Sequence, residues 1–101
     1  MQTIAGSISF GPTSGSGPQV QQTTVNFTTA PTQAIAILTG FVAEFSGGDD
    51  HNFGKLDVRV SAGPPSGTAV VVTATYGLRD WSDDWDDKYD GQVFFTVVAD
   101  P

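Results

Sequence analysis

Apolar and polar residues alternate with a period of two along most of the chain, and no apolar stripe of helical period competes with this alternation. The strand-like segments are residues 3–10, 20–29, 33–45, 55–62, 68–78 and 92–100. Stretches rich in Gly, Pro and Ser, such as GPTSGSGP at residues 11–18, separate them and should not continue a strand. Because the segments are short and no crossover helix joins them, the sequence predicts an all-β fold. We expect a single antiparallel β-sandwich of about six strands over residues 1–101, with a compact barrel as the alternative.

The last two strand-like segments have the clearest apolar faces. The inward positions predicted for them are Val70, Val72, Ala74 and Tyr76 in the first, and Val93, Phe95, Val97 and Ala99 in the second. We expect these two segments to pair as a long hairpin whose loop is residues 79–91. The segment 33–45 is apolar on both faces, which predicts a strand buried on both sides and bulged at Gly40, with a helix as its only serious rival.

The composition is that of one soluble domain. The chain has 101 residues, 39% of them hydrophobic, and contains no cysteine, which excludes a disulfide framework, a thiolate metal site and a cysteine nucleophile. The N-terminal residues lack the basic and apolar regions of a signal peptide, and no segment approaches the ~20 apolar residues of a membrane span. The compartment stays open, with a secreted or cell-surface location favoured although this chain shows no signal peptide.

Charge is unevenly distributed along the chain. The formal net charge is -7, and all charged side chains lie from Glu44 onward, so residues 1–43 carry none. Four Lys and Arg residues are too few for a basic patch, which argues against nucleic acid and anionic membranes as partners. Uncharged strand edges pair readily with other chains unless they are covered, so we expect a homo-oligomer. Short edges protected by Gly and Pro are the alternative.

The segment RDWSDDWDDKYDG, residues 79–91, combines six aspartates with three large aromatic residues. Its carboxylates could coordinate calcium, which takes six to eight oxygen ligands. The candidate ligands are Asp83, Asp84, Asp86, Asp87 and Asp90, joined by Asp49 and Asp50 if the GGDDH loop lies at the same end. The spacing excludes an EF-hand, because Trp85 and Gly91 occupy the positions that require Gly and Glu. A solvated acidic turn is the alternative to a metal site.

The aromatic residues of this segment, Trp81, Trp85 and Tyr89, recur every four positions. They could turn inward and cap the end of the sandwich, leaving the carboxylates outside. The same spacing would suit a short helix between Ser82 and Tyr89. Alternatively, exposed rings could pack against the C–H face of a sugar while carboxylates such as Asp80 accept hydrogen bonds from its hydroxyls.

A wider pattern resembles the H-type lectin domain. The pattern consists of VNFTTAPTQAIAIL, then LDVRVSAG, then a Trp-containing loop before GQVFFTVVA, and it covers residues 25–100. This resemblance implies a small six-stranded antiparallel sandwich, usually trimeric or hexameric, that binds N-acetylgalactosamine and related sugars near subunit boundaries. It further implies that Arg59 and either Trp81 or Trp85 are the sugar-contacting residues. The family's disulfide is impossible in this cysteine-free chain.

Catalysis is the third class of function to consider. The single histidine, His51, could join a Ser-His-Asp set, contact a ligand or bind a metal with Asp49 or Asp50, but no sequence elbow marks a nucleophile. We therefore predict a non-catalytic, lectin-like carbohydrate-binding module with calcium at the acidic hairpin loop as an added possibility. The ligand-binding candidates are Arg59, Asp80, Trp81, Trp85, Tyr89 and His51. The alternative is a structural module that assembles into homo-oligomers, its acidic loop serving solubility or calcium-dependent stability.

Overall fold

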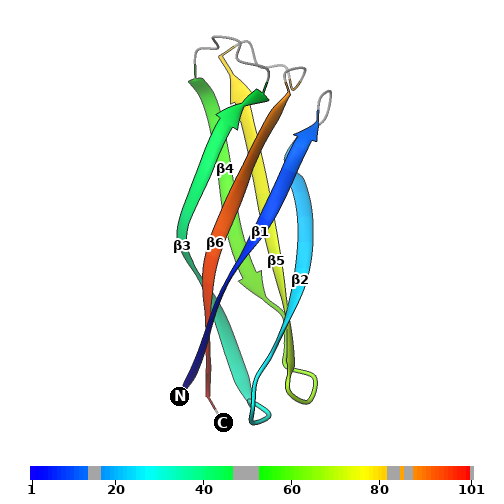
Figure 1. Cartoon of the computed structure of the whole chain (residues 1–101), viewed down its shortest axis with the longest axis vertical. Helices are drawn as coiled ribbons and strands as arrows, with labels where there is room; N and C mark the ends of the chain where they lie inside the picture. Colours follow the sequence, from blue (N-terminus) through cyan, green and yellow to red (C-terminus); the bar gives the residue numbers. More distant parts are fainter. Residues whose placement is uncertain (14–16, 47–52, 82–84, 86–87, 101) are drawn as a thin grey trace.

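Six antiparallel strands form two three-stranded sheets in the computed structural model, which describes residues 1–13, 17–46, 53–81, 85 and 88–100. The strands are β1 (Gln2–Thr13), β2 (Gln19–Asn26), β3 (Gln33–Phe45), β4 (Phe53–Ala62), β5 (Ala69–Asp80) and β6 (Tyr89–Asp100). One sheet has the order β1-β6-β3 and the other β2-β5-β4. The sheets pack face to face as an elongated sandwich (Figure 1), which confirms the predicted fold class.

The predicted hairpin between the fifth and sixth strands is wrong. β5 pairs with β2 and β4, whereas β6 pairs with β1 and β3, so the two strands belong to different sheets. Each is the middle strand of its sheet and has a neighbour on both sides. The segment between them therefore crosses from one sheet to the other. A hairpin and a crossing between sheets both reverse the chain direction, and neither changes the alternation within the two strands. The sequence pattern therefore does not distinguish them.

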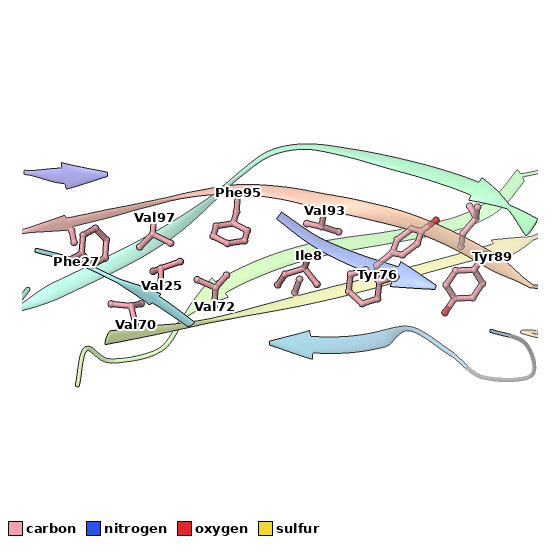
Figure 2. Packing of buried hydrophobic residues seen from close by; sticks show 14 residues of the cluster. Ile8, Val25, Phe27, Val70, Val72, Tyr76, Tyr89, Val93, Phe95 and Val97 are labelled. Carbon is pink, nitrogen blue, oxygen red and sulfur yellow. The ribbon is translucent and has the colours of Figure 1, made fainter. Parts of the chain in front are cut away.

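The core lies between the two middle strands, and the inward positions predicted for β5 and β6 are confirmed. All eight of those side chains are at most 1% exposed. The rest of the buried cluster along the sandwich (Figure 2) comes from all but two of the strands and from the residue after β2: Ile8, Phe10, Val25, Phe27, Leu78 and Tyr89. The alternate residues of each strand form the two outer faces, as the period of two requires.

β3 is an edge strand, and the prediction that it is buried on both sides is wrong within this chain. Ile35 and Val42 are 61% and 51% exposed on the outer face of its sheet. The predicted bulge is confirmed, since the pairing with β6 shifts register between Leu38 and Gly40. The extra residue changes the parity of the strand, so that odd-numbered residues face outward before the bulge and even-numbered residues face outward after it.

β1 is longer than the sequence indicated. The Gly-Pro-rich stretch was expected to stop the strand, but β1 runs through Gly11 and Pro12 to Thr13, with a register shift between Phe10 and Thr13. β1 lies at the edge of its sheet, where a proline removes no obligatory ladder hydrogen bond, and the irregularity accommodates its ring.

One end of the sandwich, called here the loop end, gathers the strand termini that flank the acidic segments. β1, β3 and β5 finish there and β2, β4 and β6 start there, while both chain termini lie at the opposite end (Figure 1). No helix in the described ranges is long and apolar enough to cross a membrane.

Candidate functional site at the loop end

The backbone at the loop end is fixed by strand pairing and by one obligatory glycine. Phe53 pairs with Asp80 across the β4–β5 ladder, and the register shifts between Phe53 and Lys55. Gly54 fills this irregularity against the backbone of Asp80 and Trp81: a Cβ atom on it would lie 2.7 Å from the Trp81 nitrogen and closer still to the Asp80 carbonyl. Only glycine allows this approach, which sets where Trp81 leaves the sheet.

A row of buried aromatic rings closes the core beneath the loop end. Phe10 meets Tyr76 edge-on with ring centroids 5.4 Å apart, and Tyr76 meets Tyr89 at 5.4 Å with perpendicular planes. Figure 2 shows both tyrosines in the space between the sheets. Gly91 makes room for this packing, because a Cβ atom on it would lie 2.8 Å from Cε2 of Tyr76. Edge-on contacts of this kind add to the stabilisation from burial itself.

Both tyrosine hydroxyls donate hydrogen bonds to backbone carbonyls of other elements. The Tyr76 hydroxyl donates to the Asp90 carbonyl at 2.6 Å, which ties β5 to β6 across the sandwich. The Tyr89 hydroxyl donates to the Gly17 carbonyl at 2.9 Å. Burial raises the pKa of Tyr76 to about 12 and also raises the pKa of Tyr89. Tyr89, a predicted ligand contact, thus lies fully inside the core.

Trp85 adopts the inward, capping arrangement. It is half-buried, packs against the core, and its ring centroid lies 6.3 Å from that of Tyr89 at an angle of 58°. The guanidinium carbon of Arg79 lies 5.6 Å from the centroid of the Trp85 ring, within the range of a cation–π interaction. One face of this indole is therefore occupied by the protein itself.

Trp81 behaves differently and projects into solvent. Its side chain is 69% exposed, and Phe53, whose strand position is opposite Asp80, is 65% exposed. These are the two most exposed aromatic side chains in the described part of the chain, and both leave the same end of the β4–β5 ladder. Asp80 is half-buried next to Trp81. This part of the loop end therefore exposes two aromatic rings, and Asp80 directly precedes one of them in the chain.

A second polar group lies on the outer face of the other sheet. Glu44 pairs with Asp90 across the β3–β6 ladder, and the Ser46 hydroxyl donates to the Asp90 carboxylate at 2.8 Å. A hydrogen bond with Asp90, together with its negative charge, raises the pKa of Glu44. An open hollow of about 290 Å³ lies beside them, between the ends of β1, β3 and β6. The sequence gives no signal for Glu44, because only the register of β3 against β6 brings it to Asp90.

Arg59 is not part of the loop end. It lies on β4 opposite Thr75, and its guanidinium donates to both carboxylate oxygens of Asp57 at 2.9 and 3.0 Å. Six residues of extended chain separate it from Phe53, a distance of roughly 20 Å. The structure therefore does not bring together Arg59 and Trp81, which the lectin resemblance implied as a pair of sugar contacts.

The remaining candidates lie outside the described residues. They are His51, Asp49, Asp50, Asp83, Asp84, Asp86 and Asp87, and the short helix expected between Ser82 and Tyr89 falls largely on the same segment. Within the described ranges, no group of three or more acidic or histidine side chains is arranged to hold a metal ion. Comparisons with protein-family models, with curated proteins and with solved structures find no match to this chain.

Proposed function

We propose that this chain is a non-catalytic recognition module that binds carbohydrate at the loop end. The observation that carries the proposal is the 69% exposure of Trp81. An indole left in water at a rigid strand end provides a flat apolar surface for the C–H face of a sugar ring. Asp80, next to it in the chain, supplies a carboxylate that can accept hydrogen bonds from sugar hydroxyls.

The two tryptophans have different roles in this proposal. Trp85 packs against Tyr89 and Arg79 and forms part of the scaffold, whereas Trp81 forms the platform. Phe53, at the start of the neighbouring strand, is a second exposed ring at the same end of the sheet. Trp81 directly follows a paired strand, and a backbone that is already held loses little ordering entropy on binding.

The arrangement of the Glu44 and Asp90 carboxyl groups favours binding without catalysis. Glu44 and Asp90 are within hydrogen-bonding reach of each other, whereas the two carboxyl groups of a retaining glycosidase are ~5 Å apart and those of an inverting enzyme are farther apart still. The pair also lies on the sheet opposite Trp81, with its charge open to solvent. It therefore suits a surface charge better than an acid and base that flank a bond.

Replacing Trp81 with alanine tests the proposal. We expect wild-type protein to be retained by at least one class of glycan on an array, and Trp81→Ala to reduce that affinity at least tenfold. Because the ring is mostly exposed, its loss should change the free energy of unfolding by less than ~0.5 kcal/mol. Phe41→Ala, which removes a 44% exposed ring from β3, is the matched control and should bind normally. Absence of wild-type binding to any glycan, or full binding by Trp81→Ala, would refute the proposal.

Calcium is a separate element of the proposal. Asp80 and Asp90 flank the acidic segment, and both lie at the loop end. A site that binds only the folded state adds ~2.7 kcal/mol at a free calcium level 100-fold above its dissociation constant. We therefore expect the melting temperature to rise when calcium replaces EDTA, with magnesium as the control cation. Identical melting curves in calcium and EDTA would eliminate the calcium site and leave the carbohydrate proposal standing.

A further inference from the structure

The outer face of the β1-β6-β3 sheet carries an apolar surface that no segment in the described part of the chain covers. Ile35 is 61% exposed and Ile37 45%, and beyond the bulge Val42 is 51% exposed. On the middle strand, Phe94 is 36% exposed, and Val98 lies beside Ile35 across the ladder. Large side chains from two neighbouring strands therefore form one continuous surface rather than isolated exposed residues, which marks an interaction surface.

Charge is confined to the two ends of this face. Glu44 and Asp90 lie at the loop end and Asp100 at the opposite end, whereas β1 and the intervening parts of β3 and β6 contain no charged residue. The chain as a whole carries -7. Two copies of so acidic a molecule repel each other least where neither carries charge. A basic partner, in contrast, would gain its electrostatic attraction at the acidic loop end and not on this face.

The area of the face is sufficient for a specific dimer. Strands of 12 to 13 residues at ~3.3 Å per residue, in three strands ~4.8 Å apart, cover roughly 600 Å² in plan. Specific interfaces bury about 600 to 1,000 Å² per partner. The whole length of the sheet is needed to reach this range, so a partner of matching length and flatness is required. A second copy of the same sheet has both properties.

We propose that a second copy of this chain packs its own β1-β6-β3 outer face against this surface, with the two β6 strands at the centre of the interface. Contact between the faces removes the exposed isoleucine, valine and phenylalanine side chains from water on both partners. Thr3, Ser7 and Ser9 of β1 form the polar rim that such interfaces have. This assembly is independent of carbohydrate binding, since Trp81 lies on the other sheet.

A pair of lysine substitutions tests the interface. Val42 and Val20 are both exposed valines on the outer faces of edge strands, but they belong to opposite sheets. We expect the mass of the wild type, measured by light scattering across a dilution series, to be at least two chains. Val42→Lys should reduce it to one chain, while Val20→Lys should leave it unchanged. A monomeric wild type, or equal effects of both variants, would overturn the proposal. If Val42→Lys unfolds, Ile35→Lys provides the same test at the other end of β3.

Cysteine substitutions locate the contact, because the natural chain has no cysteine. Thr96 and Thr75 are half-buried threonines on the outer faces of the two middle strands, β6 and β5. Face-to-face sheets lie ~10 Å apart, too far for a direct disulfide, so a short bis-maleimide reagent is used as the crosslinker. We expect it to link Thr96→Cys into a dimer and to leave Thr75→Cys monomeric on denaturing gels. A multimeric protein in which Thr96→Cys stays uncrosslinked would instead indicate pairing along the β3 edge and would overturn the face-to-face arrangement.

Discussion

The two outer faces of the sandwich differ although the two sheets are built alike. The face of β2-β5-β4 exposes Val20 and Val71 among mainly polar residues: Gln22 donates to the Thr73 hydroxyl at 3.2 Å, and Arg59 is paired with Asp57. The face of β1-β6-β3 has Phe94 in its middle strand. Both sheets have three strands and share one core, so the fold does not require this difference. The sequence of each outer face reflects what that face contacts: water on one side and, in our proposal, a second chain on the other.

The largest effect should separate inward from outward positions on β6. Phe95 is 1% exposed in the core, whereas Phe94, the residue before it, points to the outer face. Phe95→Ala should cost ~3–5 kcal/mol of unfolding free energy, because it leaves a cavity between the sheets. Phe94→Ala should cost less than ~1 kcal/mol. Urea denaturation of both variants, made in the Val42→Lys background to exclude assembly, would measure this ratio. Equal losses would contradict the assignment of the two faces.

Strand parity explains which parts of this comparison could be predicted from sequence. The inward residues of β5 and β6 follow directly from alternation, as do the strands themselves. Alternation does not reveal which strands pair, so β5 and β6 were interpreted as a hairpin although they belong to different sheets. Alternation also cannot distinguish a strand that is buried on both sides from an edge strand with an apolar outer face. β3 is apolar on both faces, yet its outer face is exposed.

The candidate site was only partly predictable for a related reason. Composition alone marks the acidic aromatic segment, and its sequence allows both inward and outward rings. The spacing of four does not determine that Trp81 is exposed while Trp85 packs on Tyr89, because this depends on where β5 ends and on the bulge at Gly54. Glu44 could not be selected, since its relation to Asp90 arises from pairing between distant strands.

A moderate effect should show whether the two sheets, with their different outer faces, unfold as one unit. The Tyr76 hydroxyl bridges from β5 to the Asp90 carbonyl on β6. Tyr76→Phe removes this bond and leaves a carbonyl without its donor, which should cost ~1–2 kcal/mol. Fluorescence and circular dichroism should still report one coincident urea transition. Two separate transitions would show that the sheets unfold independently.

Alkaline pH should weaken the same hydrogen bond between the Tyr76 hydroxyl and the Asp90 carbonyl. The folded chain keeps Tyr76 neutral until its pKa of about 12, whereas the phenol in the unfolded chain ionises near its ordinary value of 10.0. The contribution of Tyr76 to stability is therefore complete below about pH 10 and is lost as the pH rises toward 12. Wild-type stability should fall across this interval more steeply than that of Tyr76→Phe. Parallel curves of stability against pH for the two proteins would show that burial does not raise the pKa of Tyr76.

The smallest effect concerns one charged pair on each outer face. The pair on one face has opposite charges, and the pair on the other has like charges. Asp57 and Arg59 carry opposite charges, whereas a hydrogen bond with Asp90, and then the like charge of Asp90, raise the pKa of Glu44. The folded chain binds the Glu44 proton more tightly than the unfolded chain, so this contribution to stability is present below the ordinary pKa of 4.5 and is lost as the pH rises through the raised value. Glu44→Gln should therefore be slightly more stable than wild type at neutral pH.

The pH dependence distinguishes this effect from a general response to removing a carboxylate. The gap between Glu44→Gln and wild type should close as the pH falls through the titration of Glu44, because the protonated glutamate resembles the amide. Asp57→Asn is the matched control on the other face. It breaks an exposed ion pair and should lower stability by ~0.2–1 kcal/mol at neutral pH, the opposite sign. Urea midpoints measured across acidic and neutral pH would test both variants. Equal signs for the two substitutions would show that the faces do not differ in how their charges are balanced.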